Sequence, residues 1–518
     1  MKKFLLLFSL LIFSFSAVSL KAETNDKTAP SAISVAPPAP QFSDAERQAE
    51  LSKRRAKVLD SMVENSMLIL FSPEPKNYTG DVDFLYRQEN NLYYLTNLKQ
   101  KGATLVLVKN GTGNKEVLFL PKRNPAAEIW NGRMYSNEEA MTVSGLKTLV
   151  DATELKNFLQ AVKDKKAFTS KDGANVLNAA EILYLLLPND GNDSDGKAEY
   201  RKEAEFSQNL EGYKIENARP IFDKLRLIKS PLEIKFLQHA IDITTEAQER
   251  AMAIAGQAKW EYEVQAEVEY TFRRRNADYW GYPSIVGSGA DATTLPYEEA
   301  QSAVKSGDLI LMDVGAEYEH YTADVTRTFP VSGKFSKEQA EIYRAVYDAQ
   351  EAAAQTIKPG AIFNAPENAA TESLKKSLTK LGLITAPDAT YQVVSQGKTL
   401  DFPQYQLWFM HGWGHFLGMN VHDVGDYDAK FQPGMIMTNE PGIYVRADAL
   451  NNIADTPENK KFLEKIRPAF ERYKNIGVRI EDDMLVTPTG VEWLTKNLPR
   501  RLEDLEAFMT RASKEAIH

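Results

Sequence analysis

The chain has 518 residues, of which 43% are hydrophobic and 26% charged, and its formal net charge is −9. This length and composition predict a globular protein whose core is divided between two or more domains. The acidic balance disfavours nucleic-acid and anionic-membrane partners. The chain has no cysteine, which excludes disulfides and lipid attachment through a thiol.

Residues 1–22 have the layout of a secretory signal peptide. Two lysines precede an apolar run over residues 4–15, which is too short to span a bilayer comfortably. Small residues near the end allow cleavage after Ser19 or Ala22. Removing residues 1–22 deletes three lysines and changes the net charge from −9 to −12. We therefore expect an exported protein, periplasmic or secreted, with no membrane contact after signal removal; a retained membrane anchor is the alternative.

Residues 23–42 are rich in Pro, Ala and Ser and predict a disordered or extended leader. A first domain follows over residues 43–218, where Ser43 and Glu46 form a capping box that begins a helix. Strands are predicted at residues 67–71, 92–98, 104–108 and 116–121, and helices near 155–163 and 176–187. The acidic loop over residues 188–196 does not have the ligand spacing of a calcium-binding loop.

A second domain is predicted over residues 219–518. Ser230, Pro231 and Glu233 combine an N-cap, a first-turn proline and a capping-box acid, and they predict a long helix over residues 231–258. Strands and helices are mixed in both domains. The predicted fold class is therefore α/β (α+β).

Two aspartates in "GDLILMDVGAEYEHYTADVTRTF" (307–329) are the first candidate site residues. Two strand-like runs flank a turn near Tyr318 and Glu319, and a hairpin centred there places Asp313 directly opposite Asp324. Two facing carboxylates on apolar strands repel each other unless a proton or a cation lies between them. The hairpin therefore predicts a cation site, with a shifted register as the alternative.

Two glutamates extend this acidic set. Glu440 in "NEPGIY" precedes a proline and glycine turn, so constrained backbone holds its carboxylate. In "GVRIEDDMLV" (477–486), strand alternation places Arg479, Glu481 and Asp483 on one face.

Three of the six histidines in the chain, His411, His415 and His422, lie in "HGWGHFLGMNVH". They indicate a metal or catalytic centre, with ordinary packing as the alternative. Gly412 and Gly414 disfavour the helical HExxH arrangement of single-zinc proteases. Two aspartates, two glutamates and one histidine form an oxygen-rich ligand set. Such a set suits a pair of Mn(II) ions, although Co(II), Zn(II) or Fe(II) could occupy it.

The order and spacing of four motifs resemble those of the creatinase-like, or pita-bread, metallopeptidases. These motifs are "MDVGAEYEHYTADVTRTFPVSGKFS", "HGWGHFLGMNVHDVG", "NEPGIY" and "GVRIEDDMLV". The resemblance is strongest to Xaa-Pro aminopeptidases (aminopeptidase P), with prolidases as near relatives, and covers residues 222–510. More weakly, "FLYRQENNLYYLTNL" (84–98) is similar to the N-terminal domain of these enzymes. The resemblance implies a creatinase-like α/β domain followed by a pita-bread catalytic domain.

The resemblance also implies a ligand role for each motif residue. Asp313 would bind one metal, His415 and Glu440 the other, and Asp324 and Glu481 would bridge the two ions. A water or hydroxide between the metals would be the nucleophile, because two cations lower its pKa. Glu440 would accept its proton and pass it to the leaving nitrogen.

The remaining implied roles concern the substrate. By the same resemblance, His411 and His422 would polarise the scissile carbonyl and accommodate the proline after the cleaved bond. Tyr444 would line the pocket, and Arg479 would orient Glu481.

One position departs from the family pattern. These peptidases usually carry a histidine just before a tyrosine in the loop that precedes the aspartate hairpin. In "TTLPYEE" (293–299), Pro296 occupies that position, and it can neither donate a hydrogen bond nor carry a proton. Loss of a group that stabilises developing charge typically reduces the rate by roughly 10²–10³-fold. His320, in the predicted turn, is a poor replacement.

Three functions remain open. The first is an exported aminopeptidase that removes the N-terminal residue from peptides with proline in second position. The second is a prolidase, which cleaves Xaa-Pro dipeptides and commonly uses an arginine between the histidine motif and the EPG glutamate. Residues 423–439 contain only Lys430 there, which favours the aminopeptidase. The third is a peptide-binding homologue with impaired catalysis, supported by Pro296. A homo-oligomer is also left open.

Overall fold

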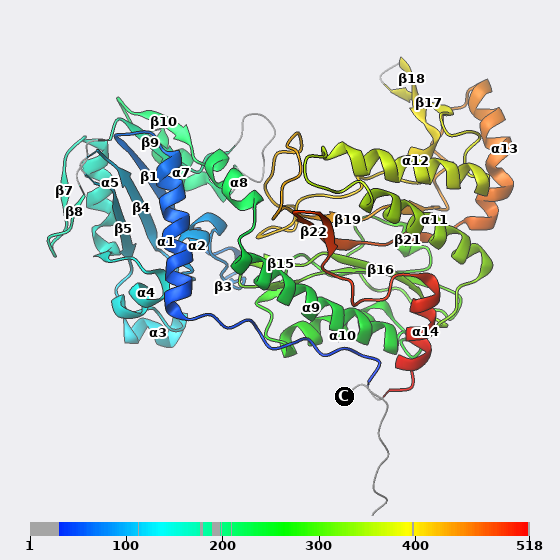
Figure 1. The fold of residues 1–518 in the computed structure, drawn as a ribbon, viewed down its shortest axis with the longest axis horizontal. Coiled ribbons are helices and arrows are strands. Elements are labelled where there is room, and N and C mark those ends of the chain that lie inside the picture. Colours follow the sequence, from blue (N-terminus) through cyan, green and yellow to red (C-terminus); the bar gives the residue numbers. More distant parts are fainter. Residues whose placement is uncertain are drawn as a thin grey trace, which may run out of the picture.

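The computed structural model describes residues 31–515, except residues 112, 177–179, 189–196, 198, 209 and 396–397. The predicted signal peptide and nearly all of the acidic loop at 188–196 lie outside the described residues. The described chain forms two parts side by side (Figure 1). None of its described helices is both long and apolar enough to cross a membrane.

The N-terminal part is built on a six-stranded mixed sheet with the strand order β10-β9-β1-β4-β5-β6. These strands are β10 (Lys214–Asn217), β9 (Ile182–Leu185), β1 (Ser66–Phe71), β4 (Thr104–Lys109), β5 (Lys115–Leu120) and β6 (Thr148–Asp151). The helices of this part include α1 (Asp44–Ser61), α2 (Asn90–Thr96), α3 (Pro125–Asn131), α4 (Asn137–Ser144), α5 (Leu155–Lys163) and α7 (Arg201–Ser207). The predicted capping box is present, because Ser43 and Glu46 exchange hydrogen bonds at the start of α1.

Two predictions for this domain are wrong: one predicted strand is a helix, and one predicted helix contains a strand. Residues 92–98 were predicted as a strand but lie largely in α2, where the Glu89 side chain accepts a hydrogen bond from the Leu92 amide and caps the helix. All seven residues of α2 are buried, so no polar face reveals a helical period. The predicted helix at 176–187 contains β9, a short apolar strand between two parallel neighbours, β1 and β10.

The C-terminal part places its strands between helix pairs (Figure 1). One pair is α9 (Pro231–Ile254) and α10 (Glu261–Arg274), and the other is α11 (Lys337–Ala354) and α12 (Asn364–Leu381). The strands between them include β12 (Ile285–Ser288), β13 (Leu309–Val314), β16 (Val325–Pro330), β19 (Ile436–Asn439), β20 (Gly442–Tyr444), β21 (Gly477–Arg479) and β22 (Asp482–Thr487). Helix α8 (Arg219–Leu227) joins the two parts.

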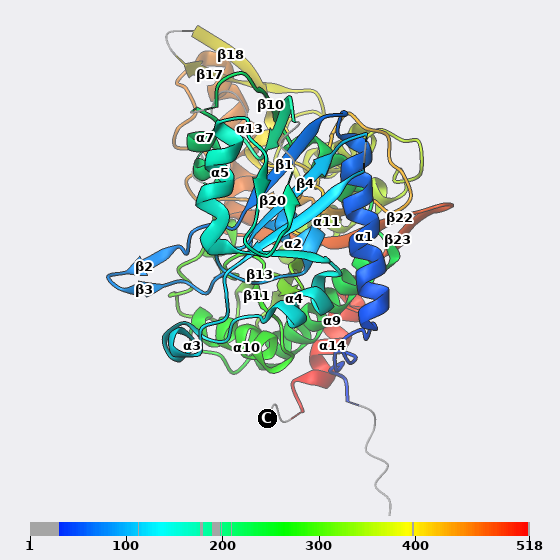
Figure 2. The ribbon, with the colours of Figure 1, turned by 90° about the vertical axis from the view of Figure 1, so that its left-hand side faces the viewer.

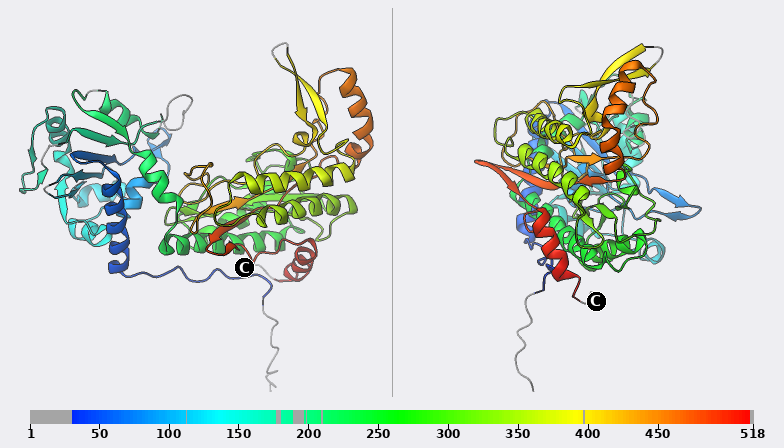
Figure 3. Two further views of the ribbon diagram at one scale, coloured as in Figure 1. Left: turned by 45° about the horizontal axis from the view of Figure 1, so that its top comes forward. Right: turned by 90° about the vertical axis from the view of Figure 1, so that its right-hand side faces the viewer.

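Two hairpins extend from the body of the molecule. The hairpin of β2 (Asn77–Thr79) and β3 (Val82–Asp83) projects from the N-terminal part (Figure 2). The hairpin of β17 (Thr390–Ser395) and β18 (Lys398–Pro403) stands beside α13 (Pro457–Tyr473) at the far end of the C-terminal part (Figure 3).

The described portion of the leader, residues 31–42, is extended and runs along the C-terminal part toward α14 (Leu502–Ala512) (Figure 1). Its backbone amides donate to buried or half-buried carboxylates: Ser34 to Glu249 at 2.5 Å and Ala36 to Glu246 at 2.8 Å. Side chains of this segment pack on the C-terminal core. Residues 31–42 are therefore extended and held against the C-terminal part in this structure.

The register of the aspartate hairpin differs from the predicted one by two residues. Asp313 on β13 pairs with Thr326 on β16, because the turn is centred on Glu319 and His320. These two residues have φ values of 52° and 67°, the left-handed conformation that tight two-residue hairpins require. The prediction that Asp313 lies directly opposite Asp324 is thus wrong. Asp324 nevertheless points to the same face, since it lies two residues before Thr326.

Candidate metal centre

Asp313 and Asp324 converge on the inner face of the sheet, and both are buried. The Tyr282 hydroxyl lies between them, 2.5 Å from Asp313 Oδ1 and 2.6 Å from Asp324 Oδ1. Burial, followed by the charges of both aspartates, holds the pKa of Tyr282 well above its usual range. One phenol therefore bridges the two carboxylates that the sequence placed together.

His415 brings an imidazole to the same point. Its Nδ1 lies 3.1 Å from the Phe416 carbonyl, so that nitrogen carries the proton and Nε2 faces the carboxylates. Nε2 is 3.3 Å from Asp324 Oδ2 and 3.3 Å from Glu440 Oε1. Burial by itself lowers the pKa of His415, but these two carboxylates outweigh it and raise the pKa to about 9. With Nδ1 bonded to a backbone carbonyl, Nε2 points at the acidic group in the orientation that a metal-binding histidine requires.

The two glutamates complete the group. Burial, followed by the Asp324 charge, is the main cause that raises the pKa of Glu440 to about 7, against the lowering effect of His415. Burial and the charges of Asp324 and Glu440 also hold the pKa of Glu481 well above its usual range. Asp324, His415 and Glu481 each offer a ligand atom within 4.8 Å of the others. The acidic groups repel one another in a buried space, which is the situation that a cation relieves.

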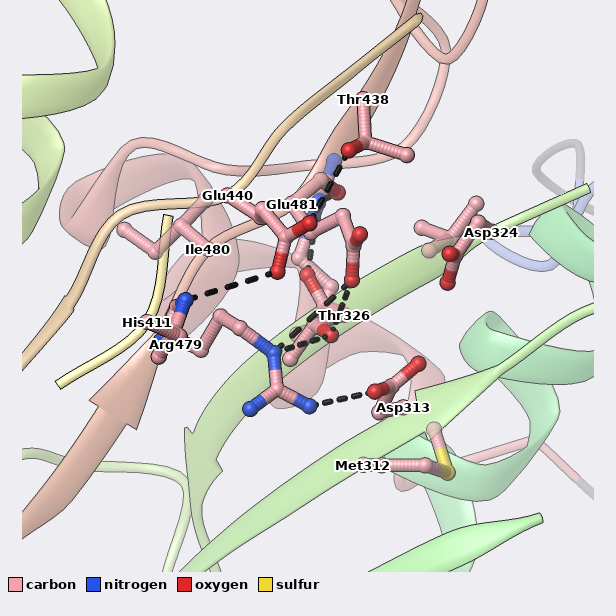
Figure 4. A network of polar contacts seen from close by, with 12 residues as sticks. Met312, Asp313, Asp324, Thr326, His411, Thr438, Glu440, Arg479, Ile480 and Glu481 are labelled. Carbon is pink, nitrogen blue, oxygen red and sulfur yellow. Dashed lines mark hydrogen bonds and ion pairs between the residues drawn. The ribbon is translucent and has the colours of Figure 1, made fainter. Parts of the chain in front are cut away.

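Arg479 and Thr326 link the two sides of this group (Figure 4). The guanidinium donates a short hydrogen bond to Asp313 and a 3.0 Å bond to the Thr326 hydroxyl. That hydroxyl donates to Glu481 Oε2 at 2.6 Å. The direct distance from Arg479 Nε to Glu481 Oε2 is 3.8 Å. Arg479 therefore positions Glu481 partly through Thr326, while its closest ionic partner is Asp313.

Two further predicted residues lie next to Glu440. His411 Nδ1 is 3.7 Å from Glu440 Oε2 and 2.8 Å from the Gly412 carbonyl. His411 Nε2 lies 2.8 Å from the hydroxyl of buried Tyr444, which itself accepts from Arg479 at 3.0 Å. Burial, followed by the Arg479 charge, lowers the pKa of His411 to about 4. His411 is therefore a neutral imidazole at the edge of the site.

His422 is the most exposed of the three clustered histidines. Its ring lies edge-on to that of His415, with the ring centroids 4.5 Å apart. Burial lowers its pKa, so it is also a neutral group near neutral pH. The fold thus brings together all five predicted ligands, the two predicted substrate-handling histidines, Tyr444 and Arg479.

The donor set fits divalent cations. Four carboxylates and one imidazole offer the oxygen-rich environment that Mn(II) prefers and that Co(II), Zn(II) and Fe(II) tolerate. A fifth acid, Asp483, accepts from the Asp324 backbone amide at 3.2 Å. The other Asp483 oxygen, Oδ1, is buried without a hydrogen-bond partner among the described residues. The arrangement matches a metal centre better than a set of structural ion pairs.

The loop with Pro296 adjoins this site. Its neighbour Leu295 packs against Tyr444, Ala292 and Leu311. Pro296 itself is exposed. His320 does not replace the expected histidine, because it is buried at the hairpin turn and stacks on Tyr93 of the N-terminal part at 3.8 Å.

Four contributing residues were absent from the predicted site: Tyr282, Thr326, Thr438 and Asp483. The Thr438 hydroxyl donates a hydrogen bond to Glu440 Oε1 at 3.0 Å and accepts one from the His415 backbone amide at 3.0 Å. Strand alternation from Asp324 could have found Thr326, and alternation from Glu481 had already placed Asp483 on the site face. Tyr282 precedes a proline in a loop, and nothing in its local sequence indicates a contact with the aspartates.

Comparison with known proteins agrees with this geometry. Residues 235–488 match the description "Metallopeptidase family M24", and residues 51–169 match "Aminopeptidase P, N-terminal domain". A Xaa-Pro aminopeptidase of Escherichia coli is 32% identical over 92% of this chain and 100% of its own length. The chain belongs to metallopeptidase family M24. A Xaa-Pro aminopeptidase of Haemophilus influenzae is 33% identical over 89% of this chain and 97% of its own.

Solved structures of the family share the architecture. Pseudomonas aeruginosa aminopeptidase PepP has a TM-score of 0.73 at 30% identity, covering 90% of this chain and 99% of its own. Escherichia coli aminopeptidase P, in a structure with the inhibitor Pro-Leu, has a TM-score of 0.73 at 30% identity, covering 92% and 100%. The predicted family and the two-domain pita-bread fold are therefore confirmed.

Proposed function

We propose that this M24 family member is a metal-dependent aminopeptidase that removes the N-terminal residue from peptides with proline in second position. The observation that carries the proposal is the convergence of buried Asp313, Asp324 and Glu481 with half-buried His415 and Glu440. Relatives that match nearly the whole chain bear the name Xaa-Pro aminopeptidase, which supports the same activity.

In this proposal, the five side chains would hold two divalent ions, and their oxygen-rich donor set favours Mn(II). When bound, such ions supply Lewis acidity that activates water and polarises the scissile carbonyl. Glu440 accepts the proton of the attacking water and delivers it to the leaving nitrogen. His411 and His422, both neutral, contact the substrate at the rim.

Tyr444 and Arg479 preserve the geometry of these groups. The Tyr444 hydroxyl accepts from Arg479 and donates to His411 Nε2, so the His411 ring is held with Nδ1 toward Glu440. Tyr444 is fully buried, and it therefore lines the site behind His411 rather than meeting bulk water.

Two alternatives remain within the proposal. A prolidase would need a cationic grip on the free carboxylate of a dipeptide, and residues 423–439 contain Lys430 but no arginine. Lys430 is exposed. A peptide-binding homologue with impaired catalysis is favoured only by Pro296. We place the protein outside the cytoplasm, periplasmic or secreted, because residues 1–22 have the layout of a signal peptide.

The test is hydrolysis by the mature chain loaded with Mn(II), using Ala-Pro-Ala tripeptides, Ala-Pro dipeptides and Ala-Ala-Ala tripeptides. We expect release of free alanine from Ala-Pro-Ala, with little cleavage of the proline-free peptide. Cleavage of the dipeptide alone would favour the prolidase. No hydrolysis with Mn(II), Co(II), Zn(II) or Fe(II) would reject both enzymatic functions.

A further inference from the structure

A groove of about 690 Å³ begins at His411 and leads away from the candidate metal centre. Its walls come from α12, from the segment before the histidine motif, and from the β17–β18 hairpin. The aromatic and apolar side chains of the groove that matter here are Tyr391, Phe402, Tyr405, Phe409 and Met410. His411 belongs both to this groove and, 3.7 Å from Glu440, to the site. The groove is therefore continuous with the reacting centre.

The outer wall of the groove is an apolar face of a hairpin. Tyr391 on β17 pairs with Phe402 on β18, so both side chains lie on the same face. Alternation places Val393 and Leu400 on this face, further toward the tip. Phe402 is 38% exposed, Leu400 is 46% exposed and, below them, Met410 is 46% exposed. Exposed apolar side chains grouped beside a catalytic site indicate a binding surface rather than scattered surface residues.

The base of the hairpin is held in place. Asn459 on α13 exchanges two hydrogen bonds with the Gln392 backbone, at 2.8 and 2.9 Å. The side-chain amide of Gln404 donates a hydrogen bond to the Thr390 carbonyl at 2.9 Å. Tyr391 also packs on Phe462 of α13, with ring centroids 6.3 Å apart. A wall fixed in this way binds a ligand without a large ordering cost.

The charges of the groove restrict its occupant. Among the described residues that line it, there is no lysine or arginine. Its carboxylate, Glu367, accepts a hydrogen bond from the Trp413 amide at 2.9 Å. Lys375, whose ammonium lies 5.4 Å from the ring centroid of Tyr405, is already paired with Glu372 at 2.9 Å. A free peptide carboxylate would therefore meet no unpaired cation among the described residues that line the groove. The lining suits the interior of a longer peptide with apolar side chains.

The position of the groove decides which part of a peptide it takes. An aminopeptidase has a single residue on the N-terminal side of the bond that it cleaves. A groove of about 690 Å³ accommodates more than one residue. One of its walls belongs to the hairpin that projects from the molecule (Figure 3). The segment that fits it is the one that leaves with the proline.

We propose that this groove binds the residues that follow proline in an extended peptide, and that Tyr391 and Phe402 select large apolar side chains there. This inference rests on the proposed Xaa-Pro aminopeptidase activity and names the class of peptide that the site takes. Selectivity arises because an apolar side chain in the groove leaves water on binding, whereas glycine has none to bury.

The test compares two C-terminally amidated peptides, Ala-Pro-Phe-Leu and Ala-Pro-Gly-Gly, with the mature Mn(II)-loaded chain. We expect kcat/KM to be about tenfold higher for the apolar peptide. Phe402→Ala should reduce this preference several-fold, and Phe402→Leu should retain most of it. Both variants should keep the melting temperature of the unmodified chain, which reports an intact fold.

Val394→Ala is the matched control. Val394 lies on the same hairpin and is 54% exposed, but alternation places it on the opposite face from Phe402. Its preference should equal that of the unmodified chain. Equal kcat/KM for the two peptides, or the same loss in Val394→Ala and Phe402→Ala, would overturn the groove assignment. Failure to cleave either peptide would instead reject the proposed function.

Discussion

Two groups of buried charges lie at the two ends of the segment from His415 to Asp423, and they are opposite in balance. Asp423 meets Arg226 at 2.7 Å and Lys229 at 3.1 Å, so one carboxylate faces two cations. Burial raises the pKa of Asp423, but the two cations outweigh it and lower the pKa below its usual range. This group is a structural ion cluster that joins α8 and the connection from α8 to α9 to the histidine segment.

The candidate metal centre has the reverse balance. Its carboxylates outnumber its cationic partners, Arg479 and His415, and the pKa values of Glu440 and Glu481 are raised, first by burial and then by neighbouring carboxylates. Burial alone does not distinguish the two groups, because both are removed from solvent. The balance of charge distinguishes them. In the structural cluster the cationic side chains outnumber the carboxylate, whereas in the candidate metal centre the carboxylates are in excess and an added cation would balance them.

The largest effect is expected at the proposed proton carrier. Glu440→Gln preserves shape but removes the base, and we expect kcat/KM on Ala-Pro-Ala to fall by about 10³-fold or more. The control is Glu372→Gln, which changes an exposed carboxylate outside both the groove and the metal centre. A Glu440→Gln variant with activity within tenfold of the unmodified chain would contradict the assigned role.

A substitution in the structural cluster of Asp423, Arg226 and Lys229 should reduce the stability of the fold. Asp423→Asn leaves Arg226 and Lys229 without their buried counter-charge, which should lower the free energy of unfolding by about 4 kcal/mol. Denaturant titration measures the loss, and it should be the same with and without Mn(II). Exposed Asp428→Asn is the control, with little expected change. A loss of stability that Mn(II) reverses would contradict the assignment of Asp423 to a structural cluster separate from the metal centre.

The pH dependence of stability should depend on Glu249, a buried carboxyl group that accepts a hydrogen bond from the Ser34 backbone amide of the leader. Burial raises its pKa from 4.5 to about 7, so the folded protein retains this proton at pH values where the unfolded chain has released it. Its contribution to stability is therefore complete below pH 4.5 and is lost as the pH rises to about 7. Relative to Glu249→Gln, the chain should lose about 3 kcal/mol across this interval. A difference that does not change with pH would contradict this account.

The smallest effect is expected at Pro296. The neighbouring Leu295 packs on Tyr444, so a histidine at 296 would be introduced beside the site. We expect Pro296→His to raise kcat on Ala-Pro-Ala by about tenfold, a part of the effect of one charge-stabilising donor. Pro296→Ala controls for the loss of proline itself. An unchanged or lower rate in Pro296→His would mean that the local site is organised around proline.

The sequence predicted which side chains converge better than it predicted their geometry. Asp313, Asp324, His415, Glu440 and Glu481 each lie in a short motif with restricted backbone or strand alternation, so the motifs alone selected the residues that the fold brings together. The register failed because both turn residues, one of them His320, adopt positive φ, which a non-glycine pair does not indicate in the sequence. Tyr282 was missed because its contact depends on how a loop lies over the hairpin.

Secondary structure followed the same division. The strands at 67–71, 104–108 and 116–121 were found because apolar runs flanked by polar turns have few other interpretations. Helix α2 was predicted as a strand and strand β9 as part of a helix, because both segments are short, apolar and largely buried. For such segments only the packing partners determine the backbone, and those partners are distant in the sequence.

Calorimetric titration of the chelator-treated chain with Mn(II) tests most directly whether the acidic group is a binding site for divalent cations. We expect two ions per chain and a melting temperature that rises with Mn(II) concentration, because a ligand that binds only the folded state stabilises it. Asp324→Asn should lose this binding, whereas Asp423→Asn should retain it. No Mn(II) binding, or equal binding by both variants, would contradict the account.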